Sequence, residues 1–471
     1  MSQSTTPRPG TLGDLRASGW VSRPVKQEVR ENATLRIRAG ESVVEGVVGY
    51  EHTVLPQLEN ALLAAHDVIF LGERGQAKTR MIRSIVNLLD EWMPIVAGSE
   101  INDDPYAPIS HHARVLVAER GDETPIEWVH RERRFGEKLA TPDTSIADLI
   151  GEVDPIKVAE GRYLSDELTI HYGLVPRTNR GIFAINELPD LAERIQVGLL
   201  NVLEERDVQI RGYKIRLPLD LMLFASANPE DYTNRGRIIT PLKDRFGAQI
   251  RTHYPLDVEV EMDVVEQESL ITSPDGVRVA VPDFMTEIVA AISQQARRSP
   301  HVNQRSGVSV RMSVANYETM VANATRRALR NGDDEVVPRV SDLEALAAST
   351  AGKIEFETVD DGREEQVLDR IVKAATLETF RSACSPERLS QLVTAFDGGL
   401  VVHTGDDVPA SEYAKLITDL PGLPDALAEL EVGETPAGVA SAVEFILEGL
   451  HLAKRLNKDA IGGKATYRGR G

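Results

Sequence analysis

The sequence has one cysteine, Cys384, among its 471 residues. A single cysteine excludes an intrachain disulfide and a metal cluster ligated by several cysteines. This usage is typical of a reducing compartment, and we therefore expect a cytoplasmic protein. In such a protein Cys384 is most simply a small buried apolar residue.

Long apolar runs and an excess of basic residues are also lacking. Because no run of 18 apolar residues occurs, no membrane span is expected. Residues 1–10 lack the apolar core of a signal peptide and are rich in Ser, Thr, Pro and Gly, which is typical of disorder. Acidic residues outnumber basic ones by 73 to 53, giving a net charge of −20. That charge argues against nucleic acid or an anionic membrane as the main partner.

What the sequence does have is apolar material for sizeable cores. Hydrophobic residues make up 42% of the chain, and its length allows two or three domains. Strands alternating with helices give way after Pro255 to an almost wholly helical pattern. These shifts predict a disordered tail over 1–35, an α/β domain over 36–255, a helical domain over 256–350, a mainly helical region over 351–460 and a disordered tail over 461–471.

One stretch carries the clearest chemistry. It follows the apolar run 68–71 and precedes a helix expected over 79–92. The stretch consists of Gly72, Glu73, Arg74, Gly75, Gln76, Ala77, Lys78 and Thr79. A strand, a Gly-containing loop, Lys-Thr and a helix form the phosphate-binding loop of ATP-binding proteins. Glycines let backbone N–H groups surround a phosphate, while Lys78 is expected to reach the β- and γ-phosphates and Thr79 to bind Mg²⁺.

Ala77 departs from the strict pattern, which has a second glycine at that position. The cost of this departure depends on the backbone. With φ below zero alanine costs little, whereas with φ above zero the loop is strained.

Two further buried strands are expected, over 181–185 and 221–227. With helices between them, the strands predict a parallel sheet covered on both faces, with ligands bound at the carboxyl ends of the strands. Residues 99–145 are polar and charged, and we assign no strand to them. The segments 208–210 and 214–217 are expected to form a hairpin.

Polar residues follow each of these strands. Glu187 is placed to orient and polarise the water that attacks ATP. Asn186 stands where an aspartate usually holds the hydration shell of Mg²⁺; its amide oxygen still accepts from a metal-bound water but carries no charge. We therefore expect weaker Mg²⁺ binding and slower turnover. Without the phosphate loop, Asn186 and Glu187 would equally suit a turn at the strand end.

Three more residues are candidates for contacts with the γ-phosphate. Asn228 ends the strand over 221–227 and is placed to position the water or touch the phosphate. Arg245, in Asp244-Arg245-Phe246, is either an arginine finger for a neighbouring subunit or a salt-bridged helix residue. Arg311 precedes a helix expected over 313–331 and is either a sensor that folds onto the nucleotide or a surface arginine.

Taken together, these motifs resemble those of the AAA+ ATPases of the magnesium chelatase I-subunit and MoxR group. The Gly-x-x-Gly-x-Ala-Lys-Thr form of the loop is similar to that of MoxR proteins. The Gly-Leu-x-x-x-x-x-Arg-Gly approach to residues 181–187 is closer to the chelatase I subunit, as is Gly151-Glu152-Val153-Asp154. The resemblance covers about residues 40–320.

The resemblance implies a fold and a set of roles. The fold is α/β: a P-loop AAA+ domain with a parallel sheet and helices on both faces, an all-α lid and a mainly helical C-terminal region. Lys78 and Thr79 correspond to Walker A, Glu187 to the Walker B catalytic residue, Asn228 to sensor 1, Arg245 to the arginine finger and Arg311 to sensor 2. The cofactors are ATP and Mg²⁺, bound between subunits of a hexameric ring, and the partner carries a von Willebrand factor A domain.

Three functions follow as hypotheses. The first is a ring-forming ATP hydrolase that drives metal insertion or the chaperone-like remodelling of a partner. The second is a non-hydrolysing scaffold that binds ATP, which Asn186 motivates. The third is an enhancer-binding transcription regulator; the Gly-Ala-Phe-Thr-Gly-Ala loop of that class does not occur in the sequence.

Overall fold

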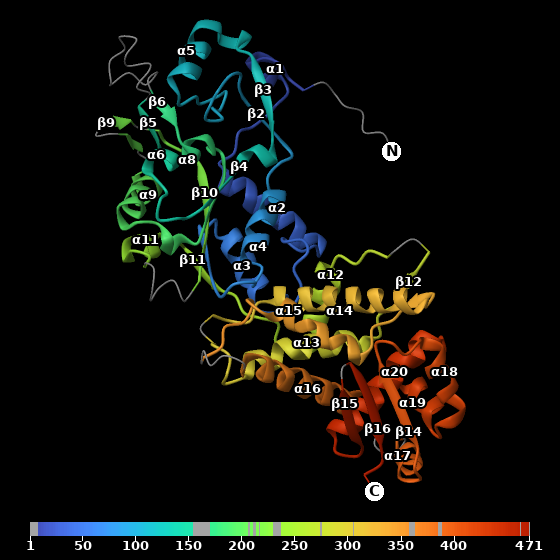
Figure 1. Cartoon of the computed structure of the whole chain (residues 1–471). Helices are drawn as coiled ribbons and strands as arrows, with labels where there is room; N and C mark the ends of the chain where they lie inside the picture. Colours follow the sequence, from blue (N-terminus) through green and yellow to red (C-terminus); the bar gives the residue numbers. More distant parts are fainter. Residues whose placement is uncertain are drawn as a thin grey trace. The chain divides into compact units, whose positions relative to one another are not determined.

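The chain divides into two compact units, Met1–His253 and Tyr254–Gly471 (Figure 1). The computed structural model describes residues 8–153, 170–205, 208–210, 213–215, 217–228, 237–273, 276–304, 306–357, 363–384, 389–461 and 463–470.

The first unit is built around a five-stranded parallel sheet. Its strands, in spatial order, are β11 (Ala248–Arg251), β1 (Val68–Leu71), β10 (Leu221–Ala227), β7 (Gly181–Asn186) and β4 (Phe135–Leu139). Every neighbouring pair is parallel, so all five carboxyl ends lie along one edge of the sheet. The loop after β1, Glu187 after β7 and Asn228 after β10 therefore come together at this edge.

Helices cover both faces of this sheet, because side chains alternate between the faces along each strand. On one face Val68 and Phe70 pack with three helices, α2 (Val25–Ala39), α3 (Val54–Leu63) and α4 (Lys78–Ser84). On the other face Ile69 packs in a cluster with α9 (Glu193–Glu205) and α11 (Thr240–Arg245). The predicted α/β fold class with a doubly covered parallel sheet is confirmed.

The prediction of a disordered tail over 1–35 is wrong where the structure describes it. Residues 12–17 form α1 (Leu12–Ala17), and α2 begins at Val25. Leu12 and Leu15 are buried against Ile126, which belongs to β3 (Ile126–His130). The apolar residue that covers Leu12 and Leu15 lies more than 100 positions away in the sequence. The composition of the N-terminal segment alone therefore suggested disorder.

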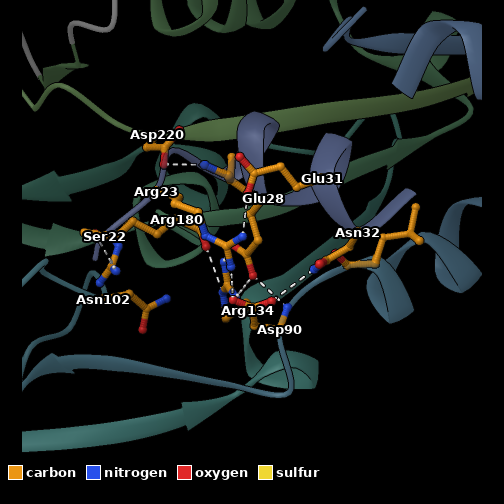
Figure 2. Close-up of polar contacts among 12 residues, drawn as sticks. Ser22, Arg23, Glu28, Glu31, Asn32, Asp90, Asn102, Arg134, Arg180 and Asp220 are labelled. Atoms are coloured by element: carbon orange, nitrogen blue, oxygen red, sulfur yellow. Dashed lines mark hydrogen bonds and ion pairs between the residues drawn. The ribbon is translucent and has the colours of Figure 1, made fainter. Parts of the chain in front are cut away.

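A buried ion pair joins α2 to the sheet (Figure 2). The two terminal guanidinium nitrogens of Arg134 donate to Glu28, Nη1 to Oε1 at 2.8 Å and Nη2 to Oε2 at 2.6 Å. The backbone N–H of Asp90 donates to the same Oε1 at 2.7 Å, and Arg134 Nε donates to the carbonyl of Arg180 at 2.9 Å. The side chains of Glu28 and Arg134 are only 6% and 1% exposed, so this pair is shielded from solvent.

The remaining elements of the first unit are short. The helix expected over 79–92 is α4 with a following 3-10 turn, Ile85–Leu88, because the chain then enters β2 (Trp92–Val96), which pairs with β3. Among the other described elements are α5 (His111–Arg120), α6 (Ile146–Leu149), α8 (Leu174–Arg177) and the strand pair β5 (Gly151–Val153) and β6 (Ile170–Tyr172). The predicted hairpin is confirmed as β8 (Val208–Ile210) and β9 (Tyr213–Ile215).

The second unit is mainly helical, as predicted. Its helices are α12 (Val258–Glu268), α13 (Asp283–Arg298), α14 (Val310–Asn331), α15 (Leu346–Thr350), α16 (Arg363–Ala383), α17 (Ser390–Asp397), α18 (Ala410–Asp419), α19 (Leu423–Glu429) and α20 (Pro436–Leu452). One hydrophobic cluster extends from Val265 to Tyr467, so the predicted regions 256–350 and 351–460 share a core. No helix in the described part of the chain has the length and apolar character to cross a membrane.

Strands complete this unit. The two-residue strands β12 (Arg278–Val279) and β13 (Glu335–Val336) pair in parallel. An antiparallel sheet has the order β14 (Val401–Gly405), β16 (Lys464–Arg468), β15 (Asn457–Ile461). The predicted disordered tail over 461–471 is therefore wrong for 464–468, which pair with strands on both sides and bury Tyr467.

Candidate nucleotide-binding site

The predicted phosphate-binding loop joins β1 to α4 and lies at the carboxyl edge of the sheet. Gly75 has φ of 76°, and Ala77, directly before α4, has φ of 53°. Both are in the left-handed region, which costs nothing special for glycine but strains alanine. Of the two alternatives for Ala77, the structure therefore has the one with φ above zero, in which the loop backbone is strained.

Gly72 begins the loop at a point of very close packing. A Cβ atom there would lie 1.9 Å from Thr252 Oγ1 and 2.2 Å from Gln76 Oε1. These two oxygens belong to a hydrogen bond, in which Thr252 Oγ1 donates to Gln76 Oε1 at 2.6 Å. Only glycine fits beside this bond, which anchors the loop to the segment after β11.

Tyr50 holds the base of the same loop. Its hydroxyl lies 3.1 Å from the carbonyl oxygen of Gln76 and 2.7 Å from that of His253. Burial raises the pKa of the Tyr50 hydroxyl, which keeps it neutral and able to donate. Tyr50, from the segment 48–51, therefore connects the phosphate-binding loop to the segment after β11.

Lys78 is buried and held by the loop that it belongs to. Its Nζ donates to the carbonyl oxygens of Gly72 and Glu73, the latter at 2.6 Å, and to Asn228 Oδ1 at 2.8 Å. The ammonium group is thus positioned by three oxygens on two different strand ends.

Asn228 connects this lysine to Glu187. While its Oδ1 accepts from Lys78, its Nδ2 donates to Glu187 Oε2 at 2.9 Å. Asn228 is only 3% exposed, so the amide is held in this orientation. Glu187 has φ of 56° and ψ of 48°, a left-handed conformation that is uncommon for glutamate. Strained residues of this kind cluster at functional sites, because the surrounding structure must hold them in place.

Asn186 contacts two side chains that the sequence analysis did not single out. Its Nδ2 donates to Glu137 Oε1 at 2.5 Å, and its Oδ1 accepts from Ser226 Oγ at 3.1 Å. Glu137 also accepts from Arg83, at 2.8 Å from Nε and 3.2 Å from Nη2. No motif marked Glu137, because β4 was not expected within the polar segment 99–145.

The oxygen-bearing side chains at this edge of the sheet are suitable ligands for a Mg²⁺ ion that is bound together with a nucleotide. Thr79 carries a hydroxyl, Asn186 an amide, and Glu137 and Glu187 carboxylates. Mg²⁺ prefers oxygen ligands, keeps several waters and is typically held by one or two protein groups together with phosphates. The chemical groups present therefore suit MgATP: residues 72–79 for its phosphates, and these oxygen ligands for its Mg²⁺.

Both predicted arginines are exposed. Arg245 is exposed at the carboxyl end of α11. The helix α14 begins at Val310, earlier than expected, with Ser309 as its N-cap. Arg311 therefore lies in the first turn of this helix and not before it, and its side chain is exposed. Arg311 belongs to the second unit, so its role as a sensor stays a prediction, as does the role of Arg245 as a finger.

Replacing Ala77 by glycine tests the strain in the loop. The left-handed conformation costs an alanine about 1–2 kcal/mol, of which about 0.5–1 kcal/mol is offset because glycine loses more entropy on folding. We expect Ala77→Gly to raise the free energy of unfolding by about 0.5–1 kcal/mol. All three tryptophans, Trp20, Trp92 and Trp128, lie in the first unit, so urea denaturation followed by tryptophan fluorescence reports on it.

Ala65→Gly is the matched control, since Ala65 has φ of 55° and lies away from the loop, after α3. A comparable gain is expected there. A loss of stability in Ala77→Gly alone would show that the alanine methyl group makes contacts that outweigh the strain.

Comparisons with known proteins agree with this picture. Proteins named magnesium-chelatase subunit ChlI from Nostoc sp. (strain PCC 7120 / SAG 25.82 / UTEX 2576) and Anabaena variabilis are each 27% identical, over 353 and 331 residues. The aligned regions cover 70% and 66% of this chain, and 90% and 93% of those proteins. No protein-family model matches the chain.

Among solved structures, one chain from the complex of subunits BchI and BchD of magnesium chelatase matches with 20% identity and a TM-score of 0.35. The match covers 68% of this chain and 97% of that one. The sequence relatives confirm the predicted resemblance: this chain is similar to magnesium chelatase subunit I, an AAA+ ATPase.

Proposed function

We propose that the protein binds MgATP at the carboxyl edge of the first unit's sheet and hydrolyses it slowly. The observation that carries this proposal is the bonded series Lys78–Asn228–Glu187, which connects the phosphate-binding loop to the carboxylate that would act on water. Lys78 is positioned to meet the β- and γ-phosphates. Asn228 holds Glu187 in place, so that Glu187 can orient the attacking water.

We further propose that hydrolysis occurs between the subunits of a ring, hexameric by resemblance. Arg245 is exposed, as a finger that acts on a neighbouring subunit's γ-phosphate must be. The work performed would be metal insertion, as the names of the relatives indicate, or chaperone-like remodelling of a partner with a von Willebrand factor A domain. Cytoplasmic location stays a prediction from the cysteine usage.

A scaffold that binds ATP without hydrolysing it is the second candidate. The observation that favours it is Asn186, which lacks the charge of the usual aspartate and whose amide is engaged by Ser226 and Glu137. In such a scaffold ATP drives assembly and turnover is near zero. Asn186→Asp should then create turnover.

The deciding experiment measures steady-state ATP hydrolysis with Mg²⁺ and, in parallel, the mass in solution with and without ATP. Turnover together with an ATP-dependent oligomer supports the ring-forming hydrolase. Nucleotide binding and assembly without turnover favour the scaffold. A monomer that binds no ATP contradicts both candidates.

A further inference from the structure

The sequence suggested that charge is missing beside the Mg²⁺ position, because Asn186 replaces an aspartate. We propose that Glu137, on the neighbouring strand β4, supplies this charge. The inference rests on the proposed binding of MgATP. It assigns to Glu137 a positioning role: its carboxylate, held against the Asn186 amide, would attract and orient the water shell of the bound cation.

The orientation of the Asn186 amide is the first support. An ionised carboxylate only accepts hydrogen bonds, so the amide must turn its Nδ2 toward Glu137. Its Oδ1 then faces Ser226, whose hydroxyl is able to donate. The reverse orientation would place the amide oxygen against the carboxylate of Glu137. Asn186 and Glu137 thus behave as one unit that carries a single negative charge.

Strand pairing explains how this unit forms. In the parallel register of β4 and β7, Glu137 lies opposite Ala184 and Leu139 opposite Asn186. Ala184 and Asn186 point to the same face of the sheet, because they are two residues apart on one strand. The carboxylate of Glu137 therefore lies one strand away from the place that an aspartate at position 186 would occupy, and a hydrogen bond connects it to the side chain at that position. A fully or partly hydrated Mg²⁺ tolerates such a displacement, since its contacts with protein carboxylates pass through water.

The helix after the phosphate loop supplies the second support. Thr79, the expected Mg²⁺ ligand, and Arg83 are four residues apart in α4 and so lie on the same helical face. Arg83 reaches Glu137. This contact places Glu137 beside the face of α4 on which the Thr79 hydroxyl is expected to meet the cation.

The Arg83–Glu137 pair does not prevent this role. The Arg83 side chain is 63% exposed, whereas that of Glu137 is 20% exposed. The pair has two hydrogen bonds, but solvent screens the exposed guanidinium and its long side chain loses freedom in the contact, so a bound cation competes with Arg83 for the carboxylate of Glu137. Arg83 can therefore turn away when a cation binds, and the pair offers a control for a purely structural role of Glu137.

The test measures Mn²⁺ binding, as a spectroscopic substitute for Mg²⁺, in the presence of a non-hydrolysable ATP analogue. Free Mn²⁺ is followed by electron paramagnetic resonance, and affinity for the analogue alone is measured in EDTA. For Glu137→Gln, which still accepts from Asn186, we expect the Kd for Mn²⁺ to rise about tenfold, the effect of about 1.4 kcal/mol. Affinity in EDTA should change less than twofold.

Two further variants keep the test decisive. Arg83→Met removes the ion pair but keeps the carboxylate, so Mn²⁺ affinity should be unchanged or higher. The double variant Asn186→Asp, Glu137→Gln keeps a hydrogen bond between the two side chains and moves the charge to position 186; it should recover the wild-type affinity.

Other outcomes overturn the proposal. Unchanged Mn²⁺ affinity in Glu137→Gln, or an equal loss in Arg83→Met, would make Glu137 a structural partner of Arg83. Failure of the double variant to recover affinity would also count against it. Wild-type protein that binds no analogue either with Mg²⁺ or in EDTA would instead refute the proposed function itself, and the inference with it.

Discussion

Glu187→Gln is expected to lower kcat for ATP hydrolysis by about 10²–10⁴-fold while changing the Kd for ATP less than twofold. The magnitude is that of losing a positioned general base. The geometry should survive, because a glutamine oxygen can still accept from Asn228 Nδ2, as Glu187 Oε2 does at 2.9 Å. A large fall in kcat at unchanged affinity separates a role in chemistry from a role in binding.

Glu193→Gln is the matched control for this experiment. Glu193 is also a glutamate after β7, at the start of α9, but its side chain is 66% exposed and lies 3.6 Å from Arg237. No change in kcat is expected there. If Glu187→Gln loses less than fivefold of a measurable wild-type turnover, Glu187 is not the residue that activates water.

The central part of the fold was predictable because it consists of buried strands. β1, β7 and β10 are mostly apolar, as strands covered on both faces must be, and β7 and β10 are followed by the polar residues Glu187 and Asn228. The two outermost strands were not predicted. β4 lies at the edge of the sheet and contains Gly136, Glu137 and Lys138, so its sequence resembles that of a loop.

The missed strand explains the missed site residue. Polar residues on an edge strand do not produce the hydrophobic pattern from which a strand is predicted. Glu137 and Asn186 are 49 residues apart, so their contact cannot be inferred from the local sequence. The motifs identified Asn186, Glu187 and Asn228 from their place at strand ends. They gave no information on which neighbours complete the hydrogen bonds of those residues, because those neighbours follow from the strand order.

The prediction for helix α2, most of which fell within the tail expected to be disordered, was limited in the same way and more strongly. Over 15 residues it buries only Val25, Val29 and Ala33 besides Glu28, so its apolar stripe is narrow. Glu28 adds a buried ion pair with Arg134, 106 residues away (Figure 2). This pair also fixes the approach to β4, since Arg134 directly precedes that strand.

Glu28→Gln is therefore expected to destabilise the attachment of α2 by about 3–5 kcal/mol, the cost of leaving one member of a buried pair without its counter-charge. The Gln oxygen can still accept from Arg134 Nη1 and from the Asp90 N–H. Its amide nitrogen, however, would face Arg134 Nη2, so that two donors meet. Hydrogen exchange of the α2 amides measures this loss directly, as a fall in protection of at least about a hundredfold.

Glu31→Gln is the control on the same helix. Glu31 pairs with Arg23, but its side chain is 41% exposed, and solvent can replace the lost partner. Protection of α2 should therefore stay unchanged. The double variant Glu28→Leu, Arg134→Met should recover much of the loss, because replacing a whole buried pair by apolar side chains leaves no charge unpaired. Equal protection in Glu28→Gln and Glu31→Gln would mean that the other contacts of α2, among them those of Asn32 with Leu88 and Asp90, hold it against the sheet, and that the ion pair is incidental to the fold.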